Sequence, residues 1–447
     1  MGFSSNWIKW ITQCVNTVSY SVLINASPTK PFKPLRGLRQ GDPLSPYLFL
    51  LCANVLSCAL LKQESSHYLK GLKIGRTNQY LSHLLFVDDS FLFFKNEKTS
   101  PITIQNTLAW YCRISGQSIN LEKSELFCTP NMTQQDKASL ANLLSVKLVS
   151  NPGKYLGLDF KLRGNIIVDF QDLITKVFTK LQGWKAKLLS QASRMTLINS
   201  VLHSIPIYTF SVFKAPYTIC KKLDSIVNAF WWGHEPGQKK LYMVNWDTIS
   251  KPKREGGIGV KKFGLMNKAL LANQYWRLCS KPNLLLTKTL KAKYSPQVDL
   301  HLHKPKNHSS WIWKSIMQPS TPTLTQGIWK VGRGHDIPVS HPLWFQFKPG
   351  APTLIADQVT RVVDLINQEN ATWKTEVITQ LYDKNTTKKI LGLAIPKIQS
   401  QSTKDQIIWP HSNSGDYQVK KAYTLLHQHQ KDNHNTPNPT TSSSSKI

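Results

Sequence analysis

Acidic residues are scarce in this chain, and their scarcity is its clearest compositional feature. The 447 residues include 25 Asp and Glu against 56 Lys and Arg, which gives a formal charge of +31. An excess of this size is too large for an ordinary solvated surface and favours a polyanionic partner, most simply nucleic acid. A membrane surface or a generally basic protein is the alternative that charge alone leaves open.

The sequence also shows no cysteine pairing, no leader and no clear membrane span. The seven cysteines form no Cys-x-x-Cys pair, and none lies beyond Cys279, so a cysteine zinc site in the last third is excluded. Scattered thiols without a signal peptide indicate a reducing compartment, and we expect an intracellular protein of the nucleus or cytoplasm. The longest apolar run, 44–61, contains Pro46 and Asn54, so we predict a buried helix over 47–61 and no membrane partner.

One adjacent acidic pair, Asp88 and Asp89, lies within the otherwise apolar stretch 84–94. The flanking apolar runs predict two strands that meet at a tight turn. Buried carboxylates are costly unless a cation receives them, and a divalent metal that handles phosphates is the usual recipient. An exposed Asp-Asp hairpin turn is the other interpretation. Before this pair, the only acidic residues are Asp42 and Glu64.

Helical periodicity dominates the chain after this region. Apolar residues recur at helical spacing from Phe170 to Trp184, and a second helix is predicted from about Arg194 to Ile205. Both helices are basic and amphipathic, which suits either a nucleic-acid clamp or an ordinary bundle with solvated lysines. The glycine-rich basic segment 251–264 predicts an exposed loop that contacts phosphate or serves only solubility.

Several motifs follow one another in a definite order. They are RQGDPLSP at 39–46, FVDD at 86–89, SGQSINLEKS at 115–124, YLGL at 155–158, LQGW at 181–184, FWWG at 230–233 and KREGGIG at 253–259. In this order and spacing, over residues 1–345, the chain resembles the reverse transcriptase of plant LINE-type non-LTR retrotransposons. A weaker match at 409–423 resembles the start of that family's C-terminal zinc-binding region.

The resemblance implies a role for each matching position. Asp88 would ligate Mg²⁺ with Asp89 beside it as a further candidate, and Lys123 would lie near the leaving pyrophosphate. The other assignments are a nucleotide and template pocket at Arg39, Gln40 and Gly41, a primer-holding strand at Tyr155, Leu156 and Gly157, and nucleic-acid contacts at Lys176, Lys180, Lys185, Lys187 and Arg194. The implied partners are an RNA template, an RNA–DNA duplex and, for an active enzyme, deoxynucleoside triphosphates.

The resemblance also implies an α+β fold. A partial reverse-transcriptase palm, with an antiparallel sheet and helices, would precede a helical thumb and a mostly α connector. The implied division is an incomplete palm at 1–165, a thumb-like region at 166–235, a basic Trp- and Gly-rich connector at 236–345, a C-terminal region at 346–427 and a disordered tail at 428–447.

The sequence departs from the family pattern in its first segment. Family members carry another metal-binding aspartate on a strand upstream of the segment that begins here, and neither Asp42 nor Glu64 matches it. We therefore expect an N-terminally truncated polymerase fragment that is inactive alone, because losing a metal ligand removes much of the electrostatic preorganisation. The alternatives are a non-catalytic basic RNA- or DNA-binding protein and a non-functional retroelement remnant.

Overall fold

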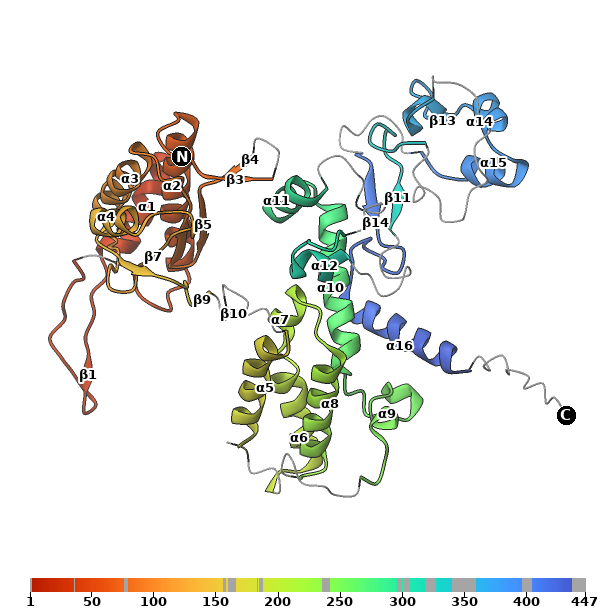
Figure 1. Cartoon of the computed structure of the whole chain (residues 1–447), viewed down its shortest axis with the longest axis horizontal. Helices are drawn as coiled ribbons and strands as arrows, with labels where there is room; N and C mark the ends of the chain where they lie inside the picture. The colour runs from red at the N-terminus through yellow and green to blue at the C-terminus, as the bar shows by residue number, and fades with distance from the viewer. Residues whose placement is uncertain are drawn as a thin grey trace. The chain divides into compact units, whose positions relative to one another are not determined.

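The structure is a computed structural model in which the chain divides into two compact units, Met1–Lys161 and Leu162–Ile447 (Figure 1). It describes residues 2–35, 37–75, 79–155, 158–159, 166–182, 184, 188–234, 242–295, 300, 305–317, 327–339, 359–395 and 404–435. Each unit has hydrophobic clusters of its own.

The first unit mixes helices with short strands. Its helices are α1 (Ser5–Asn16), α2 (Ser45–Ser65), α3 (Thr99–Ser115) and α4 (Gln134–Leu144). Its antiparallel pairs are β1 (Leu23–Ile24) with β2 (Ser27–Pro28), β3 (Leu72–Ile74) with β4 (Gln79–Leu81), β5 (His83–Phe86) with β6 (Asp89–Leu92), and β9 (Lys154–Tyr155) with β10 (Leu158–Asp159). One pair, β7 (Glu125–Phe127) with β8 (Lys147–Val149), is parallel.

The main core of this unit lies between α2 and α3. Leu56 and Leu60 of α2 pack with Leu69 and with Ile104 and Tyr111 of α3. Helix α3 ends where Gly116 adopts φ +70°, a left-handed conformation that glycine accepts without a steric penalty.

Helix α2 differs from the buried helix that the sequence predicted. Its only fully buried residues are Leu56 and Leu60, although its apolar stretch runs for most of its length. By length and composition α2 is apolar enough to cross a membrane, and 11% of its most apolar stretch is buried. One such helix is weak evidence of a span, because core helices of soluble proteins meet the same criteria.

The second unit is mainly helical. Its α-helices are α5 (Ile166–Gln182), α6 (Gln191–Leu197), α7 (Ile207–Val212), α8 (Tyr217–Trp231), α9 (Trp246–Ile249), α10 (Phe263–Ser280), α11 (Leu285–Tyr294), α12 (Trp311–Met317), α14 (Thr375–Leu381), α15 (Lys384–Leu391) and α16 (Val419–Asn435). A π-helical turn, η2 (Ile198–Leu202), continues α6, and η3 (Lys253–Glu255) and η4 (Val362–Leu365) are 3₁₀ turns. The strands are β11 (Ile328–Lys330), β12 (Ile366–Asn367), β13 (Thr372–Trp373) and β14 (Gln406–Ile408).

Helix α10 is the central element of this unit and contacts α7, α8, α12 and α16 (Figure 1). Its first turn is capped by side chains from other helices. The N–H of Phe263 donates to Asp224 Oδ1 of α8 at 3.1 Å, and the N–H of Lys262 donates to the Tyr423 hydroxyl of α16 at 2.9 Å. Burial raises the pKa of Asp224 to about 6, although the Phe263 N–H and the Lys262 cation oppose the shift.

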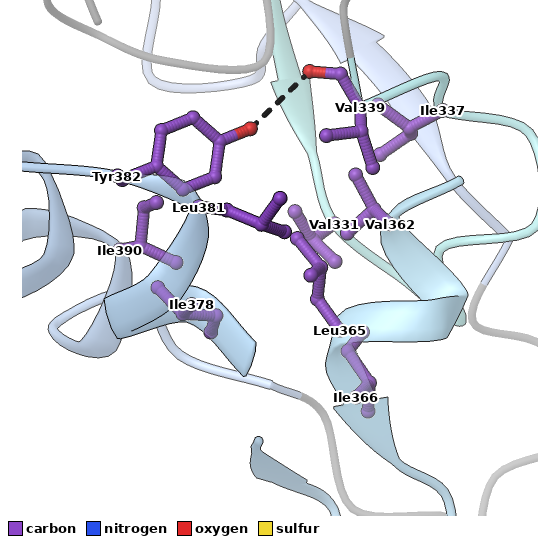
Figure 2. Close-up of a cluster of buried hydrophobic side chains, with 10 residues drawn as sticks. All are labelled: Val331, Ile337, Val339, Val362, Leu365, Ile366, Ile378, Leu381, Tyr382 and Ile390. Atoms are coloured by element: carbon purple, nitrogen blue, oxygen red, sulfur yellow. Dashed lines mark hydrogen bonds between the residues drawn. The ribbon is translucent and has the colours of Figure 1, made fainter. Parts of the chain in front are cut away.

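The last third of the chain forms a small cluster around β11, η4, α14 and α15. Figure 2 shows its aliphatic side chains facing one another, with the Tyr382 hydroxyl donating to the Val339 carbonyl at 3.5 Å. A carboxylate fastens this cluster to β14. Asp405 accepts the backbone N–H groups of Gly332, Gly334 and Asp336 at 2.6, 2.9 and 2.9 Å.

The mixed helical and strand composition agrees with the predicted α+β class. In the described part of the chain, each strand pairs with only one other, so the strands form no larger sheet there. The predicted disordered tail from 428 is wrong in its first part, because α16 continues to Asn435. The remaining tail lies outside the described residues.

Candidate metal-binding hairpin and basic surfaces

The acidic pair lies at the tip of the β5–β6 hairpin. Phe86 pairs with Asp89, which leaves Val87 and Asp88 as a two-residue turn. Leu85 and Leu92 pack on the core formed by α2 and α3, so the hairpin is held by its apolar face. Two strands that meet at an acidic turn are therefore confirmed.

Of the two interpretations of this pair, burial and an exposed turn, the structure shows the exposed turn, because Asp88 and Asp89 are both exposed. Their carboxylates stay hydrated at the turn, so no buried cation is needed to offset a desolvation cost. Val87 has φ +50°, an uncommon conformation for a β-branched residue. The strand pairing on both sides of the turn holds it there.

The turn supplies oxygen ligands of the kind that Mg²⁺ prefers. Within the described ranges, no group of three or more His, Cys, Asp or Glu side chains is placed to hold a metal ion. Mg²⁺ commonly uses one or two carboxylates and completes its shell with water and substrate phosphates. The donor type therefore fits, and Asp88 and Asp89 would contribute part of the shell.

One predicted primer-strand residue lies beside this hairpin. The Tyr155 ring of β9 meets the Phe91 ring of β6 edge to face, with centroids 4.5 Å apart. The two other residues predicted on that strand, Leu156 and Gly157, lie outside the described residues. Lys123 is exposed on a turn after α3, where its N–H donates to Asn120 Oδ1 at 3.1 Å.

The predicted nucleotide and template loop is exposed, and hydrogen bonds define its shape. Asp42 Oδ1 accepts the Leu44 N–H at 2.7 Å, and the Ser45 hydroxyl donates to the Arg39 carbonyl at 2.9 Å. Gly41 has φ +89°, and a Cβ there would have no neighbour within 4 Å. Its glycine therefore serves the backbone conformation. Gln40, beside it, is also exposed.

The basic amphipathic pattern of the second unit is confirmed for α5. Lys176 and Lys180 are exposed, while Phe170, Leu173, Ile174, Val177 and Leu181 form the buried face. Two further predicted contacts, Lys185 and Lys187, lie outside the described residues. Arg194 has a structural role, because its Nη1 donates to the Trp231 carbonyl at 2.9 Å and its guanidinium lies against Gly233.

The predicted basic loop at 251–264 begins as a tightly hydrogen-bonded turn. Ile258 N–H donates to the Ile249 carbonyl at 3.0 Å, and Gly259 N–H donates to the Lys251 carbonyl at 2.9 Å. A Cβ at Gly257 would lie 2.1 Å from the Lys251 oxygen, so only glycine fits this crossing. The adjacent glycines Gly256 and Gly257 are the feature of the sequence that indicates this close backbone approach. Beside the turn is a hollow of about 560 Å³ lined by Gln191, Ala192, Met195, Trp231, Lys253, Gly257 and Ile258.

The first unit is similar to a known protein family over almost its whole length. Residues 1–160 match the family described as reverse transcriptase (RNA-dependent DNA polymerase). This match contains the hairpin, the Arg39–Gly41 loop, Lys123 and Tyr155. The chain is 26% identical over 247 residues to the retrovirus-related Pol polyprotein of the type-2 retrotransposable element R2DM of Drosophila melanogaster, covering 52% of this chain and 21% of that protein.

Two similar proteins come from Arabidopsis thaliana. A putative ribonuclease H protein is 29% identical over 267 residues, which cover 58% of this chain and 42% of that protein, so this chain spans less than half of it. An uncharacterized mitochondrial protein is 30% identical over 153 residues, which cover 34% of this chain and 99% of that protein. With the reverse transcriptase match and the retrotransposon relative, these similarities show that the chain belongs to the reverse transcriptase family, with retrotransposon Pol proteins among its relatives.

Proposed function

We propose that this chain is part of an RNA-directed DNA polymerase and that Asp88 supplies a carboxylate for Mg²⁺, with Asp89 beside it. The observation that carries the proposal is the exposed two-aspartate turn inside the region that matches the reverse transcriptase family. In this reaction a primer 3′-hydroxyl attacks the α-phosphate of a nucleotide and pyrophosphate leaves. Bound Mg²⁺ would favour the attacking hydroxyl and stabilise the leaving oxygens.

The other predicted residues would position the substrates. Lys123 would offset charge near the leaving pyrophosphate, and Arg39, Gln40 and Gly41 would line the nucleotide and template pocket. Tyr155 would hold the primer end, and its contact with Phe91 supports that placement. Lys176 and Lys180 would follow the phosphates of an RNA–DNA duplex, because they lie on the exposed face of α5. All seven cysteines are free, which supports the proposed location in the nucleus or cytoplasm.

Primer extension on an RNA template with Mg²⁺ tests the metal assignment. Incorporation would be measured for the chain alone and with an added upstream palm-and-fingers segment that supplies further carboxylate ligands for Mg²⁺. Asp88→Asn should reduce it on the order of 10²-fold or more, because a charge-stabilising group is lost. Glu125→Gln removes another exposed carboxylate of the first unit and is the matched control. Incorporation that survives Asp88→Asn would exclude Asp88 as a metal ligand.

A second candidate function is nucleic-acid binding without catalysis. The basic turn favours it, because Lys253 and Arg254 are exposed on a backbone held by the Ile249–Ile258 and Lys251–Gly259 hydrogen bonds. A preformed backbone lets cations meet phosphates with little ordering cost.

Salt-dependent binding of a labelled single-stranded RNA measures this function. Replacing Lys253 and Arg254 together by alanine should lower the slope of log K against log salt by roughly 1 for each phosphate that the turn no longer neutralises. Lys288→Ala removes an exposed lysine from α11 and should change the slope less. A slope unchanged by the double replacement would show that this turn does not bind phosphate.

A further inference from the structure

A chain of side-chain hydrogen bonds joins the base of the β5–β6 hairpin to α2. The Ser57 hydroxyl of α2 lies 2.8 Å from His83 Nε2, and His83 Nδ1 lies 3.1 Å from the Ser82 hydroxyl. The Ser82 hydroxyl in turn donates to Glu64 Oε2, near the end of α2, at 2.8 Å. The chain thus begins and ends on the same helix and crosses the first residues of the hairpin.

For a neutral imidazole at His83, the chemistry of these groups fixes the direction of every bond. An ionised carboxylate can only accept, so the Ser82 proton is directed to Glu64. The Ser82 oxygen must then accept from His83, which places a proton on Nδ1. A neutral imidazole with Nδ1–H has an unprotonated Nε2, so Ser57 is the donor to that atom. One tautomer of His83 therefore satisfies all three contacts.

This series of hydrogen bonds from Ser57 through His83 and Ser82 to Glu64, called the relay below, lies at the open end of the hairpin, opposite the acidic turn. Ser82 is 3% exposed, and its carbonyl accepts the N–H of Phe93 at 2.7 Å, so it extends the strand ladder by one pair. In the described residues β5 and β6 pair only with each other, and a two-stranded hairpin is marginally stable by itself. A fixed attachment at the base thus limits the directions in which the turn can lie.

A glycine beside the relay confirms how closely this region is packed. A Cβ at Gly71 would lie 2.8 Å from the carbonyl of Leu81 and 2.9 Å from Glu64 Oε1. The Glu64 carboxylate therefore lies against backbone that can accommodate only glycine. The Glu64 end of this hydrogen-bonded chain is therefore closely packed.

We propose that His83, as the neutral Nδ1–H tautomer, is the positioning residue of the acidic hairpin, and that its relay from Ser57 to Glu64 sets the orientation of the Asp88 turn. The inference rests on the proposed role of Asp88 in catalysis, but its decisive measurements do not use catalysis. Burial lowers the pKa of His83, and the carboxylate of Glu64 opposes that shift in part. Protonation would convert Nε2 from an acceptor to a donor and would reverse the contact with Ser57.

The first test observes the imidazole in the unaltered full-length chain. Nitrogen NMR of ¹⁵N-histidine-labelled protein should show one histidine with a protonated Nδ1 and an unprotonated Nε2 above its pKa. The signal is assigned by its disappearance in His83→Gln. A protonated Nε2 at His83 would overturn the proposal, and this result does not depend on whether any variant folds.

The second test compares hydrogen exchange of the hairpin amides, residues 83–92, with that of α3. Ser57→Ala should speed hairpin exchange about fivefold, the factor expected when one half-buried hydrogen bond is removed, and should leave α3 unchanged. Ser65→Ala is the matched control, since this exposed serine of α2 bonds only locally to the Lys62 carbonyl. Unchanged hairpin exchange in Ser57→Ala would refute the positioning role.

The pH dependence separates positioning from simple packing. The pKa of His83 is lower in the folded state than its ordinary value of about 6.5. The stability that neutral His83 contributes is therefore present above about pH 6.5 and is lost as the pH falls through the folded pKa. Hairpin protection should fall on acidification in the unaltered chain and not in His83→Gln. If the hairpin responds but Asp88→Asn leaves extension unchanged, only the proposed function fails. If Asp88→Asn abolishes extension and the hairpin does not respond, only the positioning fails.

Discussion

Replacing the buried Asp224 by asparagine should stabilise the second unit at neutral pH. Asp224 is 9% exposed, and its carboxylate caps the first turn of α10 through the Phe263 N–H. Asparagine retains an oxygen that can accept this N–H but carries no charge. The favourable hydrogen bond is kept, and the cost of burying an ionised carboxylate is removed.

The size and sign of the effect follow from the pKa. Burial raises the pKa of Asp224 from 3.8 to about 6, so the folded state favours the protonated form. The stability that protonated Asp224 contributes to folding is fully present below the pKa of the unfolded state. It is lost as the pH rises through the pKa of the folded state. A displacement of this size corresponds to on the order of 3 kcal/mol as an upper limit. Asp224→Asn should therefore gain stability at about pH 7.5 and little at about pH 4.

Urea unfolding followed by tryptophan fluorescence measures this change, since most tryptophans lie in the second unit. Asp247→Asn is the matched control, because Asp247 is 67% exposed and pairs with Lys262 at 2.7 Å. Because the Asp247 carboxylate is mostly in solvent, its pair with Lys262 contributes little, so the control should change stability by less than about 1 kcal/mol. Destabilisation of Asp224→Asn by the same amount at both pH values would refute the reasoning.

Two further predictions concern backbone and carboxylate contacts of the second unit. Gly257→Ala should destabilise that unit by more than about 1 kcal/mol, because its Cβ would lie 2.1 Å from the Lys251 oxygen, whereas Gly392→Ala should have little effect. Equal urea midpoints for the two variants would contradict this. Asp405→Asn should cost about 2 kcal/mol, because three backbone N–H groups lose a charged acceptor. A thermal midpoint within error of the unaltered chain would show that these three hydrogen bonds contribute little.

The sequence predicted those elements whose signal is local. The apolar spacing from Phe170 to Leu181 identified α5, and the two apolar runs around Asp88 identified the hairpin. The long apolar run also located α2 but could not show how few of its residues are buried, because burial depends on the rest of the fold.

Contacts between distant segments could not be predicted in the same way. The pairing of β11 with β14, and the hydrogen bonds of Asp405 to the Gly332–Asp336 turn, join residues about 70 to 80 positions apart. The elements of the last third are short, so their periodicity is weak. Ser57 and His83 carried no motif, and their relation appears only once α2 and β5 lie together.

The unusual backbone at Val87 has a consequence for how the acidic tip can vary. A β-branched residue at φ +50° costs on the order of 1–3 kcal/mol, so the paired strands, and not local preference, impose this conformation. Glycine at this position would relieve the cost and would also admit more backbone conformations. Val87→Gly would therefore leave the charge of the turn unchanged but would widen the range of directions in which the Asp88 carboxylate points. In this turn, the backbone strain at Val87 and the narrow range of Asp88 orientations are coupled. A substitution that relieves the strain also widens that range.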